Sequence, residues 1–131
     1  MNIVIDASAI IAVIAAEPQR EALIALTRGA DLLAPQSVHW EIGNAFSAMI
    51  RRNRITLDQA TIAIRAYKRI PIRFLEIDLQ ASLEIADRLG ICAYDAYLIR
   101  CALRYNAPLL SLDRGLVSAA QRLNAQVIEV V

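Results

Sequence analysis

Short apolar segments with strand character alternate along the whole chain with longer segments of helical periodicity. The strand-like segments cover residues 3–5, 32–34, 72–75, 109–111 and 126–130. Short apolar strands that alternate with helices favour a mostly parallel sheet with helices packed on both faces. We therefore predict an α/β fold with three α/β/α layers and about five short strands. A length of 131 residues fits one domain, which we place at residues 1–131.

Seven helices are predicted between these strands. Their expected ranges are 9–15, 19–27, 37–53, 56–69, 80–89, 94–105 and 116–123. Ser37 is the expected N-cap of the third helix, and Thr56 with Gln59 has the spacing of a capping box. Gly90 is the expected glycine at the end of the fifth helix. The sixth helix is nearly all apolar, so we expect it to be central and covered on most sides.

Four acidic residues lie in apolar sequence, where a carboxylate is costly unless a positive charge meets it. Asp6 and Asp113 follow predicted strands, and Glu41 and Asp95 lie on or beside the apolar faces of predicted helices. No Lys or Arg lies at a spacing that would neutralise all four carboxylates. The simplest interpretation is one shared cation, and a cage of carboxylates with water and open positions suits Mg²⁺ or Mn²⁺.

Each acidic residue also has a purely structural interpretation. Asp6 and Asp113 could cap the helices that follow them, Asp95 could favour the positive end of its own helix, and Glu41 could be an ordinary boundary residue. The four together favour a joint site, because ligands of open α/β sheets bind beyond the carboxyl ends of the strands. Divalent ions held by carboxylates usually serve phosphate chemistry. The only histidine, His39, is expected to be a packed or surface residue.

The segments around these acidic residues resemble the PIN-domain ribonucleases, and more narrowly the VapC toxins of toxin–antitoxin pairs. The segments are Ile3-Val4-Ile5-Asp6-Ala7-Ser8-Ala9, Glu41-Ile42-Gly43-Asn44-Ala45, Tyr94-Asp95-Ala96-Tyr97-Leu98-Ile99 and Ser111-Leu112-Asp113-Arg114-Gly115-Leu116. The resemblance spans the whole chain, in order and at the usual length of that family.

This resemblance implies an endoribonuclease that depends on Mg²⁺ or Mn²⁺. The catalytic residues would be Asp6, Glu41, Asp95 and Asp113, and all four would serve the metal, with Asp6 and Asp95 expected as its direct ligands. Supporting roles would fall to Ser8, Asn44 and Ser111. The resemblance also implies a homodimer and an antitoxin that covers the active site. An apolar share of 57%, against a usual share of roughly 45–50%, agrees with two partner surfaces.

Positive charge for RNA is concentrated in one segment, although the net charge of the chain is only +1. Seven of the fourteen basic residues lie between positions 51 and 73. Arg51, Arg52 and Arg54 are therefore the candidates for RNA binding. A solvated helix surface is the alternative interpretation of this segment.

Two other functions have similar sequence requirements. A receiver-like signalling domain needs an early acidic pair and a late lysine, but the only lysine is Lys68, within a predicted helix. A phosphatase that forms an aspartyl phosphate would want a second aspartate where Ser8 stands. A dimerisation module without catalysis is a third alternative. The presence of all four carboxylates argues against it.

The compartment is expected to be the cytoplasm. Cys92 and Cys101 have no motif spacing, so we predict reduced, buried thiols. The N-terminus has no basic leader, and Asp6 interrupts its apolar stretch. The apolar run at residues 9–16 is far below the ~20 residues that a membrane span requires. We therefore predict no membrane association.

Overall fold

Five strands form one parallel sheet in the computed structural model, which describes residues 1–130. The strands are β1 (Asn2–Ile5), β2 (Asp31–Pro35), β3 (Ile72–Leu75), β4 (Leu109–Leu110) and β5 (Val127–Ile128). Their order across the sheet is β3-β2-β1-β4-β5, and all four neighbouring pairs are parallel. The predicted sheet of about five short strands is therefore confirmed.

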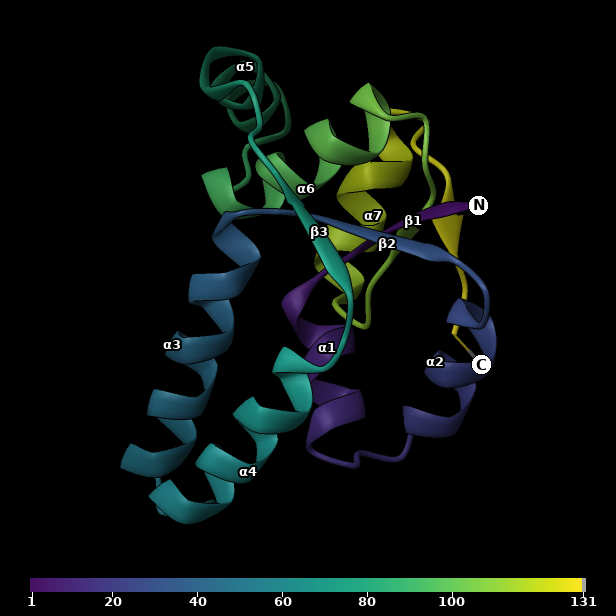
Figure 1. Cartoon of the computed structure of the whole chain (residues 1–131). Helices are drawn as coiled ribbons and strands as arrows, with labels where there is room; N and C mark the ends of the chain where they lie inside the picture. The colour runs from purple at the N-terminus through teal and green to yellow at the C-terminus, as the bar shows by residue number, and fades with distance from the viewer. Residues whose placement is uncertain (131) are drawn as a thin grey trace.

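Helices cover the sheet on both sides (Figure 1). They are α1 (Ala7–Ile14), α2 (Arg20–Thr27), α3 (Ser37–Arg51), α4 (Leu57–Lys68), α5 (Leu79–Leu89), α6 (Ala93–Arg104) and α7 (Arg114–Arg122). The first four helices lie on one side, where α1 contacts α2, α3 and α4, while α5–α7 lie on the other, where α6 crosses β1, β2 and β4. This is the predicted three-layer α/β/α arrangement.

The strand order creates a crevice at the middle of the sheet. The chain moves from β1 outward through β2 to β3, and then returns to the opposite side of β1 at β4. Open α/β sheets bind their ligands at this kind of reversal, beyond the carboxyl ends of the strands. Ile5 pairs with Leu110, so the residues that follow them, Asp6 and Ser111, emerge side by side.

The core fills the space between the sheet and its helices with aliphatic side chains. Residues 3–5 of β1 and both residues of β4 are buried, which explains why these segments are continuously apolar rather than alternating. The largest fully buried side chains include Ile3, Leu33, Ile42, Leu98, Ile99, Leu109 and Leu116. The base of the crevice is thus built on the most rigidly packed part of the molecule.

The helix ends confirm most, but not all, of the predicted caps. Thr56 and Gln59 form the capping box at the start of α4. Gly90 ends α5 with a φ of +67°, a conformation that favours glycine. The prediction of Ser37 as an N-cap was wrong, because Gln36 already has helical dihedral angles and the helix starts one residue earlier. Within residues 1–130, the buried Oγ of Ser37 has no hydrogen-bond partner.

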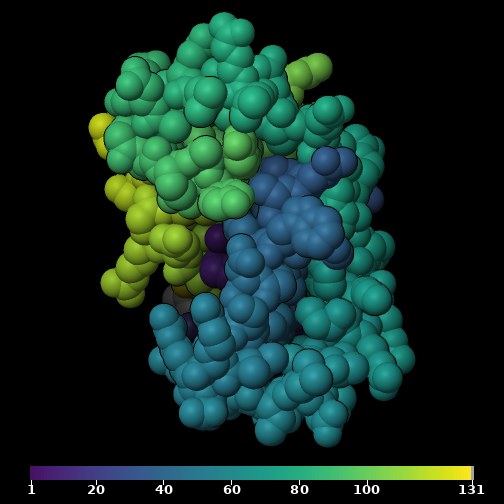
Figure 2. All heavy atoms as spheres, turned by 90° about the vertical axis from the view of Figure 1, so that its left-hand side faces the viewer, coloured from purple at the N-terminus to yellow at the C-terminus, as the bar shows by residue number. Residues whose placement is uncertain are grey.

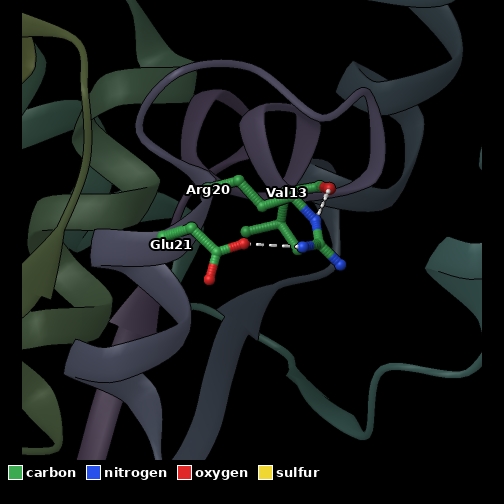
Figure 3. A network of polar contacts seen from close by, with 3 residues as sticks. All are labelled: Val13, Arg20 and Glu21. Atoms are coloured by element: carbon green, nitrogen blue, oxygen red, sulfur yellow. Dashed lines mark hydrogen bonds and ion pairs between the residues drawn. The ribbon is translucent and has the colours of Figure 1, made fainter.

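A polar contact fixes the corner between α1 and α2 (Figure 3). The Nε of Arg20 donates to the carbonyl oxygen of Val13 at 3.2 Å, and its Nη1 lies 3.0 Å from Oε1 of Glu21. The Val13 carbonyl belongs to the last turn of α1, where carbonyl groups lack partners within the helix. Arg20 therefore has a structural role away from the crevice.

The two cysteines differ in environment. Cys101 is buried as predicted, and burial raises the pKa of its thiol to about 12. Cys92 is exposed, so its predicted burial was wrong: it occupies the N-cap position of α6, outside the packed face of that helix.

No helix among residues 1–130 combines the length and the apolar character needed to span a bilayer.

Candidate active site

Asp6 lies at the base of the crevice, directly after β1, and only 4% of its surface is exposed. It is the N-cap of α1, where Oδ1 accepts a hydrogen bond from the backbone N–H of Ala9 at 3.1 Å. Burial raises the pKa of this carboxyl, while hydrogen bonds from Ser111, Ala9 and Ser8 oppose that effect. Asp6 is therefore a helix cap, as its structural interpretation requires, and its second oxygen accepts hydrogen bonds from side chains.

Two serine hydroxyls hold the Asp6 carboxylate from the β4 side and from α1. Ser8 Oγ donates to Asp6 at 2.8 Å, and Ser111 Oγ donates to Oδ2 at 2.6 Å. Each serine oxygen also accepts a backbone N–H, from Leu112 at 3.0 Å and from Asp113 at 2.9 Å respectively. Ser8 and Ser111 thus connect the end of β4 to the end of β1 and set the orientation of Asp6.

Glu41 reaches the same region from the first half of α3. Its carboxyl is half-buried, and burial together with the negative charges of Asp6 and Asp95 raises its pKa to about 7. In the described part of the chain, the buried Oε1 of Glu41 has no hydrogen-bond partner. A buried carboxylate oxygen without a donor is costly unless a cation or water occupies the space beside it.

Asp95 and Asp113 complete the acidic set. Asp95 is half-buried in the first turn of α6; burial and the charge of Asp113 raise its pKa, and the nearby Cys92 thiol partly offsets this rise. Asp113 is exposed and caps α7, with Oδ1 accepting from Leu116 N–H at 3.1 Å. A side chain at Gly115 would place its Cβ 3.3 Å from that oxygen, so glycine leaves room for the carboxylate.

The four carboxylates converge from four elements. Glu41 is influenced by the charges of Asp6 and Asp95, and Asp113 acts on both aspartates, so the charge interactions form a closed ring. Figure 2 shows a hollow between α3 (blue), α6 (green) and α7 (yellow-green), with N-terminal atoms (purple) at its base. The fold thus brings the charges of these four residues within range of one another.

The carboxylates are near one another without forming a closed cage. Among residues 1–130, no three His, Cys, Asp or Glu side chains lie close enough together to enclose an ion. An open, all-oxygen arrangement fits Mg²⁺, which keeps several waters and uses one or two carboxylates. The unpartnered oxygen of Glu41 and the all-oxygen donor set are the features that suit such an ion.

The other predicted residues lie outside this hydrogen-bonded core. Asn44 is exposed on α3, one turn beyond Glu41. Arg51, Arg52 and Arg54 are exposed at the far end of α3, with Arg51 about 15 Å along the helix axis from Glu41. The basic cluster thus lies at the opposite end of α3 from Glu41.

Sequence reasoning missed one neighbour of the site. The thiol of Cys92 stands at the N-cap position of α6, three residues before Asp95, and lowers the pKa of that carboxyl. His39 agrees with the expectation of a packed or surface residue, because it is exposed and its Nδ1 lies 2.8 Å from the Tyr67 hydroxyl.

The PIN domain family matches residues 3–122 of the chain. A crystal structure of PAE2754 from Pyrobaculum aerophilum is similar, with a TM-score of 0.75 and 23% identity, over 97% of this chain and 83% of that one. The Mycobacterium tuberculosis VapC20 toxin, described as cleaving the sarcin–ricin loop, has a TM-score of 0.64 and 14% identity, over 89% of this chain and 94% of that one. Rickettsia felis VapBC2, bound to a promoter DNA fragment, has a TM-score of 0.68 and 12% identity, over 98% of each chain. At these identities the likeness concerns the fold. No curated protein matches the sequence.

Proposed function

Since this chain belongs to the PIN domain family, we propose that it is a metal-dependent endoribonuclease that acts as the toxin of a toxin–antitoxin pair. PIN domains are nucleases, and two of the similar folds are VapC20, a toxin described as cleaving the sarcin–ricin loop, and the VapBC2 complex. The narrower statements about metal, RNA and partners rest on the site and on its surroundings.

The observation that carries this proposal is the convergence of Asp6, Glu41, Asp95 and Asp113 at the switch point between β1 and β4. Three of these carboxyls have raised pKa values, mainly because they are buried and in smaller part because their negative charges repel one another. A purely structural site would not need so many like charges. Perturbed groups gathered in a cleft are instead typical of functional sites.

Asp6 and Asp95 would hold a Mg²⁺ or Mn²⁺ ion directly, with Glu41 and Asp113 binding its waters or completing its shell. Such an ion would polarise a phosphoryl oxygen of the substrate and lower the pKa of a bound water. The role of Asp6 depends on its orientation, which Ser8, Ser111 and the Ala9 N–H fix from three sides. Glu41 has a pKa of about 7 in the absence of a metal ion, which suits it to accept a proton at the edge of the site.

The receiver-like alternative fits the strand order poorly. Receiver domains use the order 2-1-3-4-5, whereas the order here is β3-β2-β1-β4-β5. Lys68 lies on α4 rather than after a late strand. A dimerisation module without catalysis stays an alternative that only an activity measurement separates from the proposal.

Three partners belong to the proposal: RNA, a second copy of the chain and an antitoxin. Arg51, Arg52 and Arg54 would contact RNA phosphates beyond the carboxylates, since all three are exposed. Large apolar side chains are exposed on α4, where Leu57 is 69% and Ile62 is 65% accessible, and these suit a protein partner. Cytoplasmic localisation stays a prediction from the sequence.

Mapping of RNA 5′ ends in cells tests this proposal. Cells that express the chain should accumulate new 5′ ends at defined positions, and cells that express Asp95→Asn should not. Asp58→Asn is a matched control, because Asp58 is an exposed carboxylate in the first turn of α4, away from the hollow. Identical 5′ ends with the wild type and with Asp95→Asn would contradict the assignment of the nuclease site.

A further inference from the structure

A cavity of about 160 Å³ lies between α1, α2 and the face of the sheet that these helices cover. Eight side chains line it, from β1, α1, α2, β2 and the connection that precedes β3. The lining includes buried residues such as Ile10 and Leu23 and half-buried ones such as Ile24 and Ile70. The cavity therefore reaches from the core towards the surface, and none of the four site carboxylates lines it.

The lining is almost entirely aliphatic. Seven of the eight side chains are Ile, Leu or Val, and the eighth is Thr27, near the end of α2. The Oγ1 of Thr27 already donates a hydrogen bond to the carbonyl oxygen of Leu23 at 2.8 Å. A buried water needs about two to four polar partners, whereas an apolar cavity of about 150 Å³ stays dry and binds benzene or xenon. This lining thus favours an uncharged, apolar occupant over water.

Helix α2 is fixed at both ends, and this keeps the cavity from closing. At its start, the Nε of Arg20 donates to the carbonyl oxygen of Val13 at 3.2 Å (Figure 3). After its end, Gly29 has a φ of +76° and turns the chain towards β2. Between these points Leu23 is the only buried residue of the helix. Since α2 packs closely at a single side chain, space stays open beside it.

We propose that this cavity binds one small apolar molecule, an uncharged ring or a branched hydrocarbon of roughly the size of benzene. The volume limits the occupant: pockets for drug-sized ligands measure roughly 300 Å³ or more, and this cavity holds about 160 Å³. A nucleotide or a peptide segment is too large for it. Binding here is independent of the proposed nuclease function.

Two of the lining residues flank the base of the carboxylate crevice. Ile5 precedes Asp6 in the chain, and the N–H of Ile10 donates to the Asp6 carbonyl oxygen at 3.2 Å. An occupant that packs on Ile5 and Ile10 adds contacts behind Asp6. Because the cavity exists only in the folded chain, the occupant should also raise the melting temperature.

Methyl NMR with benzene as the probe tests the proposal, on the metal-free chain without RNA. The isoleucine δ1 methyls are labelled, and the ring shifts the resonances of the methyls that it contacts. We expect saturable shifts at Ile5, Ile10, Ile24 and Ile70, and none at Ile99, which is buried on α6 across the sheet. Xenon should shift the same four methyls. Benzene at ten times its dissociation constant should raise the melting temperature by roughly 4–6 °C.

Variants and a polar analogue test the location and the apolar character of the site. Ile24→Phe should fill the cavity and weaken benzene binding at least about tenfold. Leu26→Phe, which adds the same ring to an exposed residue of α2 outside the lining, is the matched control. Thr27→Val keeps the volume without the hydroxyl and should bind benzene at least as tightly. Phenol, of nearly the same size, should bind the wild type at least about tenfold more weakly, since its hydroxyl finds no partner.

Four results would overturn the proposal. The first is the absence of saturable shifts at the four methyls, which decides the matter even where Ile24→Phe fails to fold. The second is equal binding of benzene and phenol, and the third is unchanged benzene binding by folded Ile24→Phe. The fourth is a shift of the Ile24 methyl that grows with protein concentration without benzene, which would assign the cavity to a second copy of the chain. None of these measurements uses RNA cleavage, so the nuclease proposal stands or fails separately.

Discussion

The hydroxyl of Ser111 donates a hydrogen bond to Oδ2 of Asp6 at 2.6 Å, across 105 positions of sequence. The same hydroxyl oxygen accepts the backbone N–H of Asp113 at 2.9 Å. Ser111 therefore connects two of the four carboxylate residues, one after β1 and one after β4. The orientation of Asp6 depends on how the central strands pair, and not only on its own position in the chain.

Replacement of Ser111 tests this connection. Ser111→Ala should lower RNA cleavage by about 10- to 100-fold, the usual effect of removing a residue that orients a metal ligand. It should also lower the free energy of unfolding by about 1–3 kcal/mol, because it removes a buried hydrogen bond to the Asp6 carboxyl. Ser111→Thr should retain most activity, since it keeps the hydroxyl. Ser118→Ala, on the exposed part of α7, is the control, and equal activity of the two alanine variants would refute the connection.

The stability of the metal-free chain should fall with rising pH because of Glu41. Its carboxyl pKa is 4.5 in the unfolded reference and about 7 in the fold, so the folded state binds the extra proton. This contribution to stability is complete below about pH 4.5 and is lost as the pH rises through about 7. Melting temperatures measured in EDTA should therefore fall as the pH rises through this range, and the melting temperature of the Glu41→Gln variant should fall less.

Added Mg²⁺ should reverse this trend. A cation beside Glu41 favours the carboxylate, so the metal should bind more tightly above pH 7 than below it and should release protons on binding. Calorimetry in two buffers of different ionisation enthalpy measures the proton release. Mg²⁺ binding without proton release at neutral pH would separate Glu41 from the metal site.

The basic end of α3 should determine the salt dependence of RNA binding. If Arg51, Arg52 and Arg54 contact phosphates, their triple replacement by Ala should reduce the slope of log affinity against log salt by up to about 2, at roughly 0.7 per phosphate contact. The control removes the same charge elsewhere, in the triple variant Arg28→Ala, Arg88→Ala, Arg104→Ala. An unchanged slope in the first variant would assign these arginines to solvent or to the antitoxin.

A homodimer is expected in solution. Exposed Leu57 and Ile62 on α4 leave apolar surface that a second copy can cover. Light scattering at micromolar concentration should give twice the monomer mass of 14.5 kDa. Leu57→Asp with Ile62→Asp should shift that mass towards the monomer. A wild-type mass of 14.5 kDa would refute the dimer.

The sequence predicted the fold class because the strands are short and uniformly apolar and the helices have clear ends. The capping box at Thr56 and the glycine at position 90 are local signals, and local chemistry determines both. Ser37 failed as a cap because the residue before it, Gln36, is already helical through its tertiary surroundings: its N–H donates to the carbonyl of Leu75 at the end of β3. No local pattern encodes that contact.

The sequence pointed to the members of the candidate site but not to the connections among them. Asp6 and Glu41 could be picked out because carboxylates rarely follow such apolar sequence. The hydrogen bonds from Ser111 to Asp6 and from the Leu112 N–H to Ser8 could not be derived, because they require β4 to lie beside β1 rather than beside β3. Strand β4 also ends at Leu110, one residue earlier than predicted, and this leaves the Ser111 side chain and the Asp113 N–H available to each other.

RNA cleavage by the purified chain, without antitoxin, tests the central claim most directly. We predict cleavage in Mg²⁺ or Mn²⁺ and none in excess EDTA. Asp6→Asn and Asp95→Asn should each lose at least about a hundredfold in rate, because a lost metal ligand removes several kcal/mol of charge stabilisation. Both variants should keep their metal-free melting temperature or raise it, since burial and neighbouring charges raise the pKa of both carboxyls. Full cleavage in EDTA, or wild-type cleavage by both variants, would contradict a metal-dependent nuclease at this site.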